Sequence, residues 1–356
     1  MSNNIYVDLT MSNLDLNRIP ASFNERRNGN IIDTPSNYEL SITRFQVTTS
    51  SLPVYIPIIK INSDDSNKTM LEVTMTSNDF NVTTALNWIP EIKNIATPPP
   101  PSQNVSGLQS SSEYYYSYSY SWLPFLVQKT LQTCFLELQA LDESLATAGK
   151  PYFYFDSLSG GCSILSCDSK FFNSYDEDGN NSTSNVKIFF NQPLYSLFSS
   201  FCSTYDGKLF QIIVNSNNFN KTEINNVNYT NALQEYSTVQ CQNPVKSIAF
   251  TSSNLPVVSE NINSPLLFIN GQNMTNDASN STSKIITDIQ SSSLSYKPEL
   301  TMYPSAEFRY ISMHKAGPIN EMQISIFWRN LLGELIPLYL PPGGTASLKI
   351  YFKKIK

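Results

Sequence analysis

The residues able to carry catalysis are few in this sequence, and they stand apart from one another. His314 is the single histidine, which excludes a two-histidine metal centre and leaves one base for a serine or cysteine triad. We expect it on the surface, in a loop just before Gly317 and Pro318. An enzyme made from this chain would have to depend on paired carboxylates.

Three neighbouring acids, Glu137, Asp142 and Glu143, resemble an acid and base pair. They fall on a predicted helix, opposite its apolar face or at its end, which indicates a solvated surface. Residues 175–180 resemble a calcium loop, but EF-hand spacing puts Asn185 at the last position, where an acidic ligand is required. With 12 glycines and no glycine-rich phosphate loop, the sequence predicts no enzyme, no cofactor and no metal site.

The cysteines indicate packing rather than chemistry. Their number is odd and no pair has CxxC spacing, which argues against a disulfide framework and against a zinc knuckle. We expect buried free thiols. The five cysteines are Cys134, Cys162, Cys167, Cys202 and Cys241.

The surface is made of hydroxyl and amide groups more than of charges. Charged residues are 15% of the 356 residues, against about 25% in an average soluble protein, whereas the chain has 49 serines and 38 asparagines. It contains no apolar run of about 20 residues for a membrane span, and residues 1–13 are too polar for a secretory signal. We expect a soluble protein made inside a cell.

Strands should position most of the residues, because apolar and polar residues alternate along many short segments. Leu71, Val73 and Met75 share one face of such a segment, and residues 346–352 show the same alternation. Further strands are expected at 38–48, 53–61, 151–157, 186–191, 208–214, 244–251, 285–290, 307–313, 321–328 and 336–340. This number of strands predicts an all-β fold, a sandwich or a barrel.

One segment has helical rather than strand spacing. Its apolar residues recur every three or four positions, and Gly149 and Pro151 follow as stop signals. They are Leu123, Leu126, Val127, Leu131, Cys134, Phe135, Leu138, Leu141 and Leu145. We predict an amphipathic helix that covers the sheet or closes one end of it.

Two segments lack a clear period. Residues 1–35 match neither strand nor helix, and turn residues such as Asn28 and Gly29 favour an extended arm that needs a partner. Residues 97–120 are of low complexity, with four prolines at 98–101 that predict an exposed, stiff loop. The tyrosines after them suit an exposed recognition loop, although alternation with serine fits an ordinary strand as well. They are Tyr114, Tyr115, Tyr116, Tyr118 and Tyr120.

Arginine is confined to the two ends of the chain. All six arginines lie in the first 44 or the last 48 residues, and residues 45–308 have a net charge of −10 against +4 for the two ends together. Because arginine suits bidentate, partly buried ion pairs, we predict that the ends form one contact surface while the acidic middle faces water; chance placement is the alternative. The pI of about 5.0 argues against a nucleic-acid reader. Only the basic residues at the C-terminus, Lys353, Lys354 and Lys356, could contact nucleic acid, and only weakly.

The C-terminal part has the most specific pattern. It contains YPSAEFRYIS (303–312), ISIFWR (324–329), Gly333, IPLYL (336–340) and SLKIYFK (347–353), and PYFYFD (151–156) and IFFNQPLYSLF (188–198) lie upstream. In these segments the chain resembles the penton, or vertex, capsid proteins of virophages and polinton-like viruses. The resemblance covers most of the sequence outside 78–120 and 261–284 and includes no catalytic signature.

The resemblance implies a single jelly roll: an N-terminal arm at 1–36 and one domain over 37–356, with loop insertions at 78–121 and 261–284. It implies a homopentamer that closes the fivefold vertices of an icosahedral capsid, in a virion assembled in the host cytoplasm or a viral factory. The arm would reach beneath major capsid proteins with a double jelly roll, and minor capsid proteins are further partners. The arginines expected at the base, against other capsid chains, are Arg18, Arg26, Arg27, Arg309 and Arg329.

Other functions stay open at this point. A β-sandwich with a tyrosine-rich loop could bind glycans or a host surface as a spike or fibre head. A minor capsid protein elsewhere in the shell would share the same composition. A carboxylate-based glycan hydrolase needs two acids facing each other across a cleft, and no segment of the sequence indicates such a pair.

Overall fold

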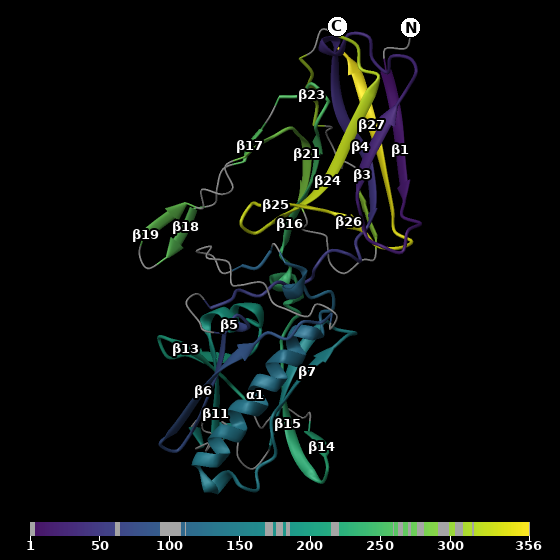
Figure 1. The fold of residues 1–356 in the computed structure, drawn as a ribbon. Coiled ribbons are helices and arrows are strands. Elements are labelled where there is room, and N and C mark those ends of the chain that lie inside the picture. Colours follow the sequence, from purple (N-terminus) through teal and green to yellow (C-terminus); the bar gives the residue numbers. More distant parts are fainter. Residues whose placement is uncertain are drawn as a thin grey trace. The chain divides into compact units, whose positions relative to one another are not determined.

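The computed structural model describes residues 4–60, 65–92, 108–110, 112–167, 174–175, 181–182, 186–214, 221–258, 260–262, 266–269, 272–275, 281–290, 299–302, 309–314 and 317–355. The chain forms two compact units (Figure 1). Met1–Pro53 and Pro244–Lys356 make the first, called the jelly-roll unit for its strand order. Val54–Asn243 make the second, called the inserted unit. This division corrects the prediction of one domain over 37–356 with a loop insertion at 78–121.

The jelly-roll unit consists of strands drawn from both ends of the chain. They are β1 (Asn4–Ser12), β2 (Ile19–Pro20), β3 (Ser22–Arg26), β4 (Tyr38–Thr48), β16 (Val245–Ser252), β17 (Glu260–Ile262), β18 (Leu266–Ile269), β19 (Gln272–Thr275), β20 (Ser281–Ser283), β21 (Ile285–Gln290), β22 (Glu299–Met302), β23 (Ile311–Ser312), β24 (Glu321–Asn330), β25 (Leu335–Pro337), β26 (Tyr339–Leu340) and β27 (Thr345–Lys354). Within the predicted insertion at 261–284, β17 pairs with β20 and β18 pairs with β19.

Eight of these strands form two antiparallel sheets. One sheet has the order β1-β27-β4-β22, and the other has the order β3-β24-β16-β21. Counted along the chain, these are strands 1, 8, 3, 6 and strands 2, 7, 4, 5, which is the order of an eight-stranded jelly roll. The all-β prediction is therefore confirmed, and the single jelly roll is the unit made by the two ends.

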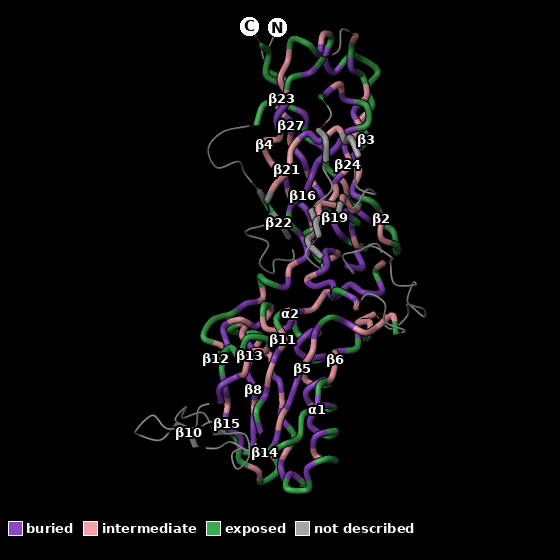
Figure 2. Tube along the Cα trace, turned by 90° about the vertical axis from the view of Figure 1, so that its left-hand side faces the viewer, coloured by how far each residue is buried: buried purple, intermediate pink, exposed green. Residues whose placement is uncertain are grey.

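The core of the jelly-roll unit follows from the alternation seen in the sequence. On β24 and β27, buried and half-buried residues alternate along most of each strand. The inward residues of the two sheets meet, since the rings of Phe45 on β4 and Phe250 on β16 lie edge to face at 4.6 Å. Figure 2 shows buried residues recurring along these strands.

The N-terminal arm is a strand of this sheet, which corrects the sequence prediction. All nine residues of β1 pair with β27, from Asn4 opposite Lys353 to Ser12 opposite Thr345. Val7 on β1 is buried against the core. The local pattern could not show this, because the partner strand lies at the far end of the chain: Tyr351 and Asn4, joined by a hydrogen bond, are 347 residues apart.

The inserted unit is a continuous stretch of chain with two larger sheets, one two-stranded pair and a long helix. Its elements are β5 (Lys68–Ser77), β6 (Phe80–Asn87), α1 (Trp122–Leu141), β7 (Tyr152–Asp156), β8 (Gly161–Cys167), β9 (Ser174–Tyr175), β10 (Asn181–Ser182), β11 (Val186–Asn191), α2 (Gln192–Leu197), β12 (Ser203–Tyr205), β13 (Leu209–Ile212), β14 (Lys221–Ile224) and β15 (Val227–Leu233). The sheets have the orders β12-β13-β11-β5-β6 and β14-β15-β8-β7. The predicted strand at 53–61 forms isolated bridges instead.

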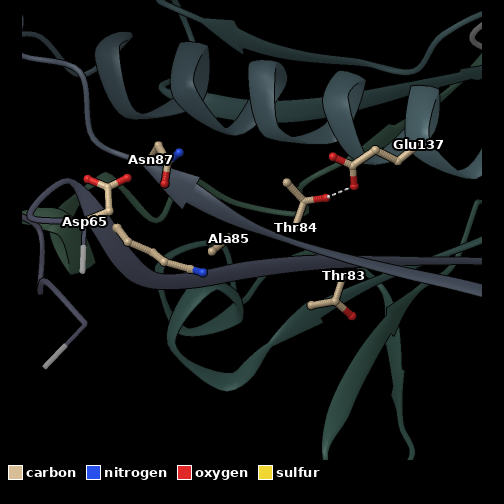
Figure 3. A pocket seen from close by; sticks show the side chains of 7 residues that line it. Asp65, Thr83, Thr84, Ala85, Asn87 and Glu137 are labelled. Atoms are coloured by element: carbon tan, nitrogen blue, oxygen red, sulfur yellow. Dashed lines mark hydrogen bonds between the residues drawn. The ribbon is translucent and has the colours of Figure 1, made fainter. Parts of the chain in front are cut away.

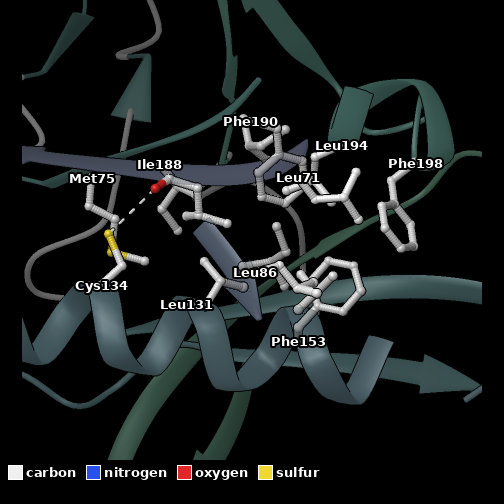
Figure 4. Packing of buried hydrophobic residues seen from close by; sticks show 14 of the residues in the cluster. Leu71, Met75, Leu86, Leu131, Cys134, Phe153, Ile188, Phe190, Leu194 and Phe198 are labelled. Carbon is white, nitrogen blue, oxygen red and sulfur yellow. Dashed lines mark hydrogen bonds between the residues drawn. The ribbon is translucent and has the colours of Figure 1, made fainter. Parts of the chain in front are cut away.

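Helix α1 confirms the predicted amphipathic helix. Its apolar stripe, including Leu131, Cys134 and Phe135, is buried against β5, β6 and β7 (Figure 4), except for Leu141 at the end of the helix, which is exposed. Phe153 on β7 packs at 6.4 Å from the ring of Phe190 on β11, so both sheets and the helix share one core. Neither α-helix in the described ranges is long and apolar enough to span a bilayer.

Candidate assembly surfaces

The residues with catalytic potential are structural or exposed. His314 is exposed, and its backbone N–H donates to the Pro256 carbonyl at 2.9 Å. Glu137 and Glu143 are exposed as predicted, but Asp142 is buried. Its carboxylate accepts from Ser77 Oγ at 2.7 Å, Asn78 Nδ2 at 2.9 Å and the Ser144 N–H at 3.0 Å. These hydrogen bonds lower the pKa of Asp142 to about 2, so it holds the helix end against the β5–β6 turn as an anion.

The cysteines divide into two groups. Cys134, Cys162 and Cys167 are buried free thiols as predicted, whereas Cys202 and Cys241 are exposed, contrary to the prediction. Burial raises the pKa of Cys134 to about 11 and that of Cys162 to about 12, so both stay protonated at neutral pH. Among the described residues no cluster of His, Cys, Asp and Glu is placed to hold a metal ion. Of the calcium-like loop at 175–180, residues 176–180 lie outside the described residues.

An open, polar pocket of roughly 420 Å³ lies beside β6 in the inserted unit (Figure 3). It is lined by Asp65, Lys68, Thr83, Thr84, Ala85, Asn87 and Glu137. Glu137 accepts a hydrogen bond from Thr84 Oγ1 at 3.2 Å. Figure 3 shows Asp65 and Glu137 at opposite ends of the pocket.

The predicted recognition loop is packed inside the inserted unit, which corrects the prediction of exposed tyrosines. Tyr114, Tyr115, Tyr116 and Tyr120 are buried and Tyr118 is half-buried. Residues Glu113–Tyr115 form a 3₁₀ turn, and Ser117 bridges to Tyr55 rather than continuing a strand.

Each of the first three tyrosines finds a hydrogen-bond acceptor, and this explains their burial. Tyr114 Oη donates to Asn67 Oδ1 at 3.0 Å and Tyr115 Oη to the Ser66 carbonyl at 3.1 Å, while Tyr116 Oη donates to the Ser110 carbonyl. Burial raises the pKa of Tyr115 to about 12. The proline run at 98–101 lies outside the described residues.

The five arginines expected at one base are spread along the jelly-roll unit. Arg26 is opposite Glu321 at the start of β24, whereas Arg329 lies near the end of the same strand, about 26 Å away at 3.3 Å per residue. Arg27 directly follows Arg26 at the end of β3, whereas Arg309 precedes β23 and pairs with Asp288 on β21 at 3.2 Å. Arg18 precedes β2. The arginines therefore share a unit, and they do not form one cluster.

A second group of tyrosines forms an exposed surface that the sequence did not reveal. It lies on the outer face of the sheet β1-β27-β4-β22, near the termini, and we call it the tyrosine patch. Its members are Tyr6, Tyr310, Tyr351, Lys349 and Lys353. The rings of Tyr6 and Tyr351 stack at 4.8 Å with an interplanar angle of 13°, and Tyr310 meets Tyr351 edge-on at 6.4 Å.

Cations surround these rings. Lys349 Nζ lies 5.5 Å from the centre of the Tyr6 ring, and Lys353 Nζ lies 4.7 Å from that of Tyr310. At the border of the patch, Asp8 accepts from Arg44 Nη2 at 3.0 Å and pairs with Lys349 at 3.4 Å. Desolvation, with the neighbouring Tyr6 and Tyr310, raises the pKa of Tyr351.

The signal for this patch was only partly present in the sequence. Lys349, Tyr351 and Lys353 stand at the outward positions of the predicted strand at 346–352. The pairing of Tyr6 with Tyr351 depends on the register between β1 and β27, which no local pattern encodes. Tyr310 comes from a loop between strands, and no pattern in the sequence indicated that it would join the other two rings.

The comparisons with known proteins agree over the whole chain. The sequence profile of the Sputnik minor capsid protein V18/19 family matches residues 5–354. A chain of the Sputnik virophage structure, determined by cryo-electron microscopy at 3.5 Å resolution, is similar with a TM-score of 0.82 and 23% identity, over 99% of this chain and 98% of that chain. The crystal structure of the mavirus penton protein is similar with a TM-score of 0.64 and 19% identity, over 99% of both chains.

No curated protein sequence matches the chain. The family match spans both units and nearly every described strand, so it applies to the whole molecule rather than to one fold element. It also agrees with the resemblance found in the sequence, and it makes this a structural protein of the virophage capsid. The chain belongs to the Sputnik minor capsid protein V18/19 family.

Proposed function

We propose that this capsid protein is the penton subunit, which forms a homopentamer and closes the fivefold vertices of the icosahedral shell. The observation that carries the proposal is the likeness to the mavirus penton protein over 99% of both chains, with a TM-score of 0.64. In a heterologous ring, each subunit contacts one neighbour through one surface and the other neighbour through a different surface. The two sides of the jelly-roll unit differ and can supply these two surfaces. The role is structural rather than catalytic, in keeping with the capsid family.

The partners follow from this position. The subunit meets its own copies in the ring and the major capsid proteins around it. The end of the jelly-roll unit that carries the termini holds Arg26 and Arg27 together with Lys353 and Lys354, so it is the end that we assign to contacts with other capsid chains. The same C-terminal lysines are the residues that could contact the genome weakly.

The native mass of the full-length chain tests the proposal. Light scattering behind a sizing column, over a concentration series, should give five times 40.1 kDa. The full chain is needed because β1 is part of the sheet. A mass of one subunit at every concentration, together with particles whose vertices contain a different chain, would contradict the proposal.

A minor capsid position elsewhere in the shell is the second candidate. It is favoured by the family description, which names a minor capsid protein and no vertex. The two candidates place the same fold at different symmetry positions. Electron cryo-microscopy of the virion, with this chain fitted into the map, separates them, because the penton occupies the fivefold axes alone.

A further inference from the structure

The tyrosine patch has the properties of a binding surface that is ordered before binding. Tyr6 is 57% exposed and Tyr310 is 37% exposed, yet each ring is held by the contacts given above. Tyr351 Oη also donates to Asn4 Oδ1 at 2.9 Å. Because the rings are already fixed, docking a partner on them costs little side-chain entropy. Tyrosine and arginine are enriched at the energetic centres of interfaces, with charged residues at the rim.

The patch extends to the edge of its sheet. β1 is the last strand of the order β1-β27-β4-β22, and among the described strands none pairs with its other side. It is nine residues long and in unbroken register with β27. Long, regular edges are sites where a second chain adds or covers a strand. Tyr6 and Asp8 therefore connect the aromatic surface to an edge that a neighbour can cover.

The charges indicate which neighbour this is. The inserted unit has nine lysines, no arginine and seventeen acids, a net charge of −8, whereas the jelly-roll unit has a net charge of +2. Copies of a chain with a net charge of −6 repel one another overall. A ring about one axis brings like units of neighbouring copies to the same height. There, two jelly-roll units (+2 against +2) meet at a lower electrostatic cost than two inserted units (−8 against −8), and the tyrosine patch lies on the jelly-roll unit.

We propose that the tyrosine patch and the β1 edge are one half of the interface between subunits, and that the jelly-roll unit of a second copy docks on them. The inference rests on the proposed pentamer and names the residues that hold it together. The contact is heterologous: the tyrosine patch of one copy binds a different face of the next copy. Repeating this contact around the axis closes a ring. Tyr6, Tyr310 and Tyr351 are its centre, and Asp8, Arg44 and Lys349 lie at its rim.

The test compares two double variants of the full-length chain. The patch variant is Tyr6→Ala with Tyr310→Ala. The control is Tyr154→Ala with Tyr236→Ala, two tyrosines of the inserted unit that are 57% and 62% exposed. Light scattering and sedimentation over a concentration series measure the assembly of each, and circular dichroism and thermal melting verify the fold. Lys349→Glu is a second patch variant that retains all three rings.

We expect wild type and control to form pentamers, and the patch variant to need at least about tenfold more protein for half-assembly, as loss of a hot spot implies. Equal assembly of patch variants and control would overturn the interface and leave the penton function standing. A wild-type chain that stays monomeric would overturn both. The two failures are thus distinguishable.

A nucleic-acid ligand is the other occupant that aromatic rings with lysines suit. A fluorescently labelled single-stranded thymidine oligonucleotide, measured by anisotropy at low and high salt, is the probe. We expect no difference in its binding between wild type and the patch variant. Salt-sensitive binding that the patch variant loses, while its pentamer is intact, would assign the surface to nucleic acid and overturn the inference.

Discussion

The two units of this protein differ in charge, in chain continuity and in the fate of their tyrosines. The jelly-roll unit holds all six arginines and has a net charge of +2, while the inserted unit has no arginine and a net charge of −8. In the first, exposed tyrosines form a surface; in the second, a run of tyrosines is buried in the core. This difference is the one expected if, as proposed above, the jelly-roll unit makes the contacts of assembly and the inserted unit does not.

Continuity of the chain distinguishes how each unit can fold. The inserted unit is one stretch, Val54–Asn243, with its core clustered around α1. The jelly-roll unit needs strands from both ends, because β27 lies between β1 and β4. Contacts at such sequence separation form slowly, since a long loop must close first. We therefore expect the inserted unit to fold before the jelly-roll unit.

Deleting residues 1–12 has the largest expected effect. It removes β1, including the buried Val7 and Leu9, and at about 1.5–3 kcal/mol for each buried side chain it costs the jelly-roll unit more than about 3 kcal/mol. Hydrogen exchange with mass spectrometry should show β27 and β4 unprotected and α1 unchanged. If β27 stayed protected from hydrogen exchange in the shortened chain, residues 1–12 would be a dispensable arm and not a structural strand.

That prediction concerns the part of the fold which the sequence did not show. The alternation predicted β4, β11 and β21 at the residues where they lie, because period-two burial is a local property. The pairing of β1 and the division into two units depend on contacts between segments that are far apart in the sequence. Local patterns of apolar and polar residues therefore could not predict them. The arm prediction took the absence of a strong pattern in 1–35 for the absence of a strand.

Cavities in the two cores should destabilise each unit separately. Phe250→Ala removes a fully buried ring from the jelly-roll unit and Phe153→Ala one from the inserted unit, and each should cost about 3–5 kcal/mol. Urea unfolding gives the free energies, and hydrogen exchange shows which unit has lost protection. Phe125→Ala, at a ring 40% exposed, is the control and should change little. Equal loss of protection in both units from either variant would show that they unfold as one.

Acid should act on the inserted unit through Asp142. Its folded pKa of about 2 lies below the ordinary value of about 3.9, so the carboxylate stabilises the folded state above about pH 4 and this contribution disappears as pH falls toward 2. Asp142→Asn should lower the urea midpoint at pH 7 and remove the part of the pH dependence below 4. The effect should be smaller than that of either cavity.

Fluorescence can assign that effect to the inserted unit. In a Trp328→Phe background the remaining tryptophans, Trp88 and Trp122, both lie in the inserted unit. Glu143→Gln, at the exposed neighbouring acid, is the matched control. An unchanged slope of stability with pH in the Asp142→Asn variant would contradict the role given to its three hydrogen bonds.

The candidate surfaces were harder to predict than the fold. Burial of Tyr114 and Tyr115 depends on acceptors at Asn67 and Ser66, far enough along the chain that composition alone indicated exposure. The tyrosine patch needs the register of β1 against β27 and a ring from the loop before β23. The sequence predicted one contact surface for the arginines; they share a unit, but Arg26 and Arg329 lie near opposite ends of β24.

Asp8→Asn should have the smallest effect on stability and still sharpen the contrast between the units. The ion pair with Arg44 is half exposed, with 37% and 50% of the two side chains accessible, so its loss should cost less than about 1 kcal/mol. It raises the net charge of the jelly-roll unit by one unit beside the tyrosine patch. If the patch is the contact between copies, this added charge should change how strongly assembly depends on salt. Sedimentation at 50 and 500 mM salt measures that dependence, and the melting temperature should stay nearly constant.

Asp156→Asn is the control, because it changes the charge of the inserted unit by the same amount. It should leave the salt dependence of assembly unchanged. An equal shift in both variants would mean that net charge, and not the patch, governs association.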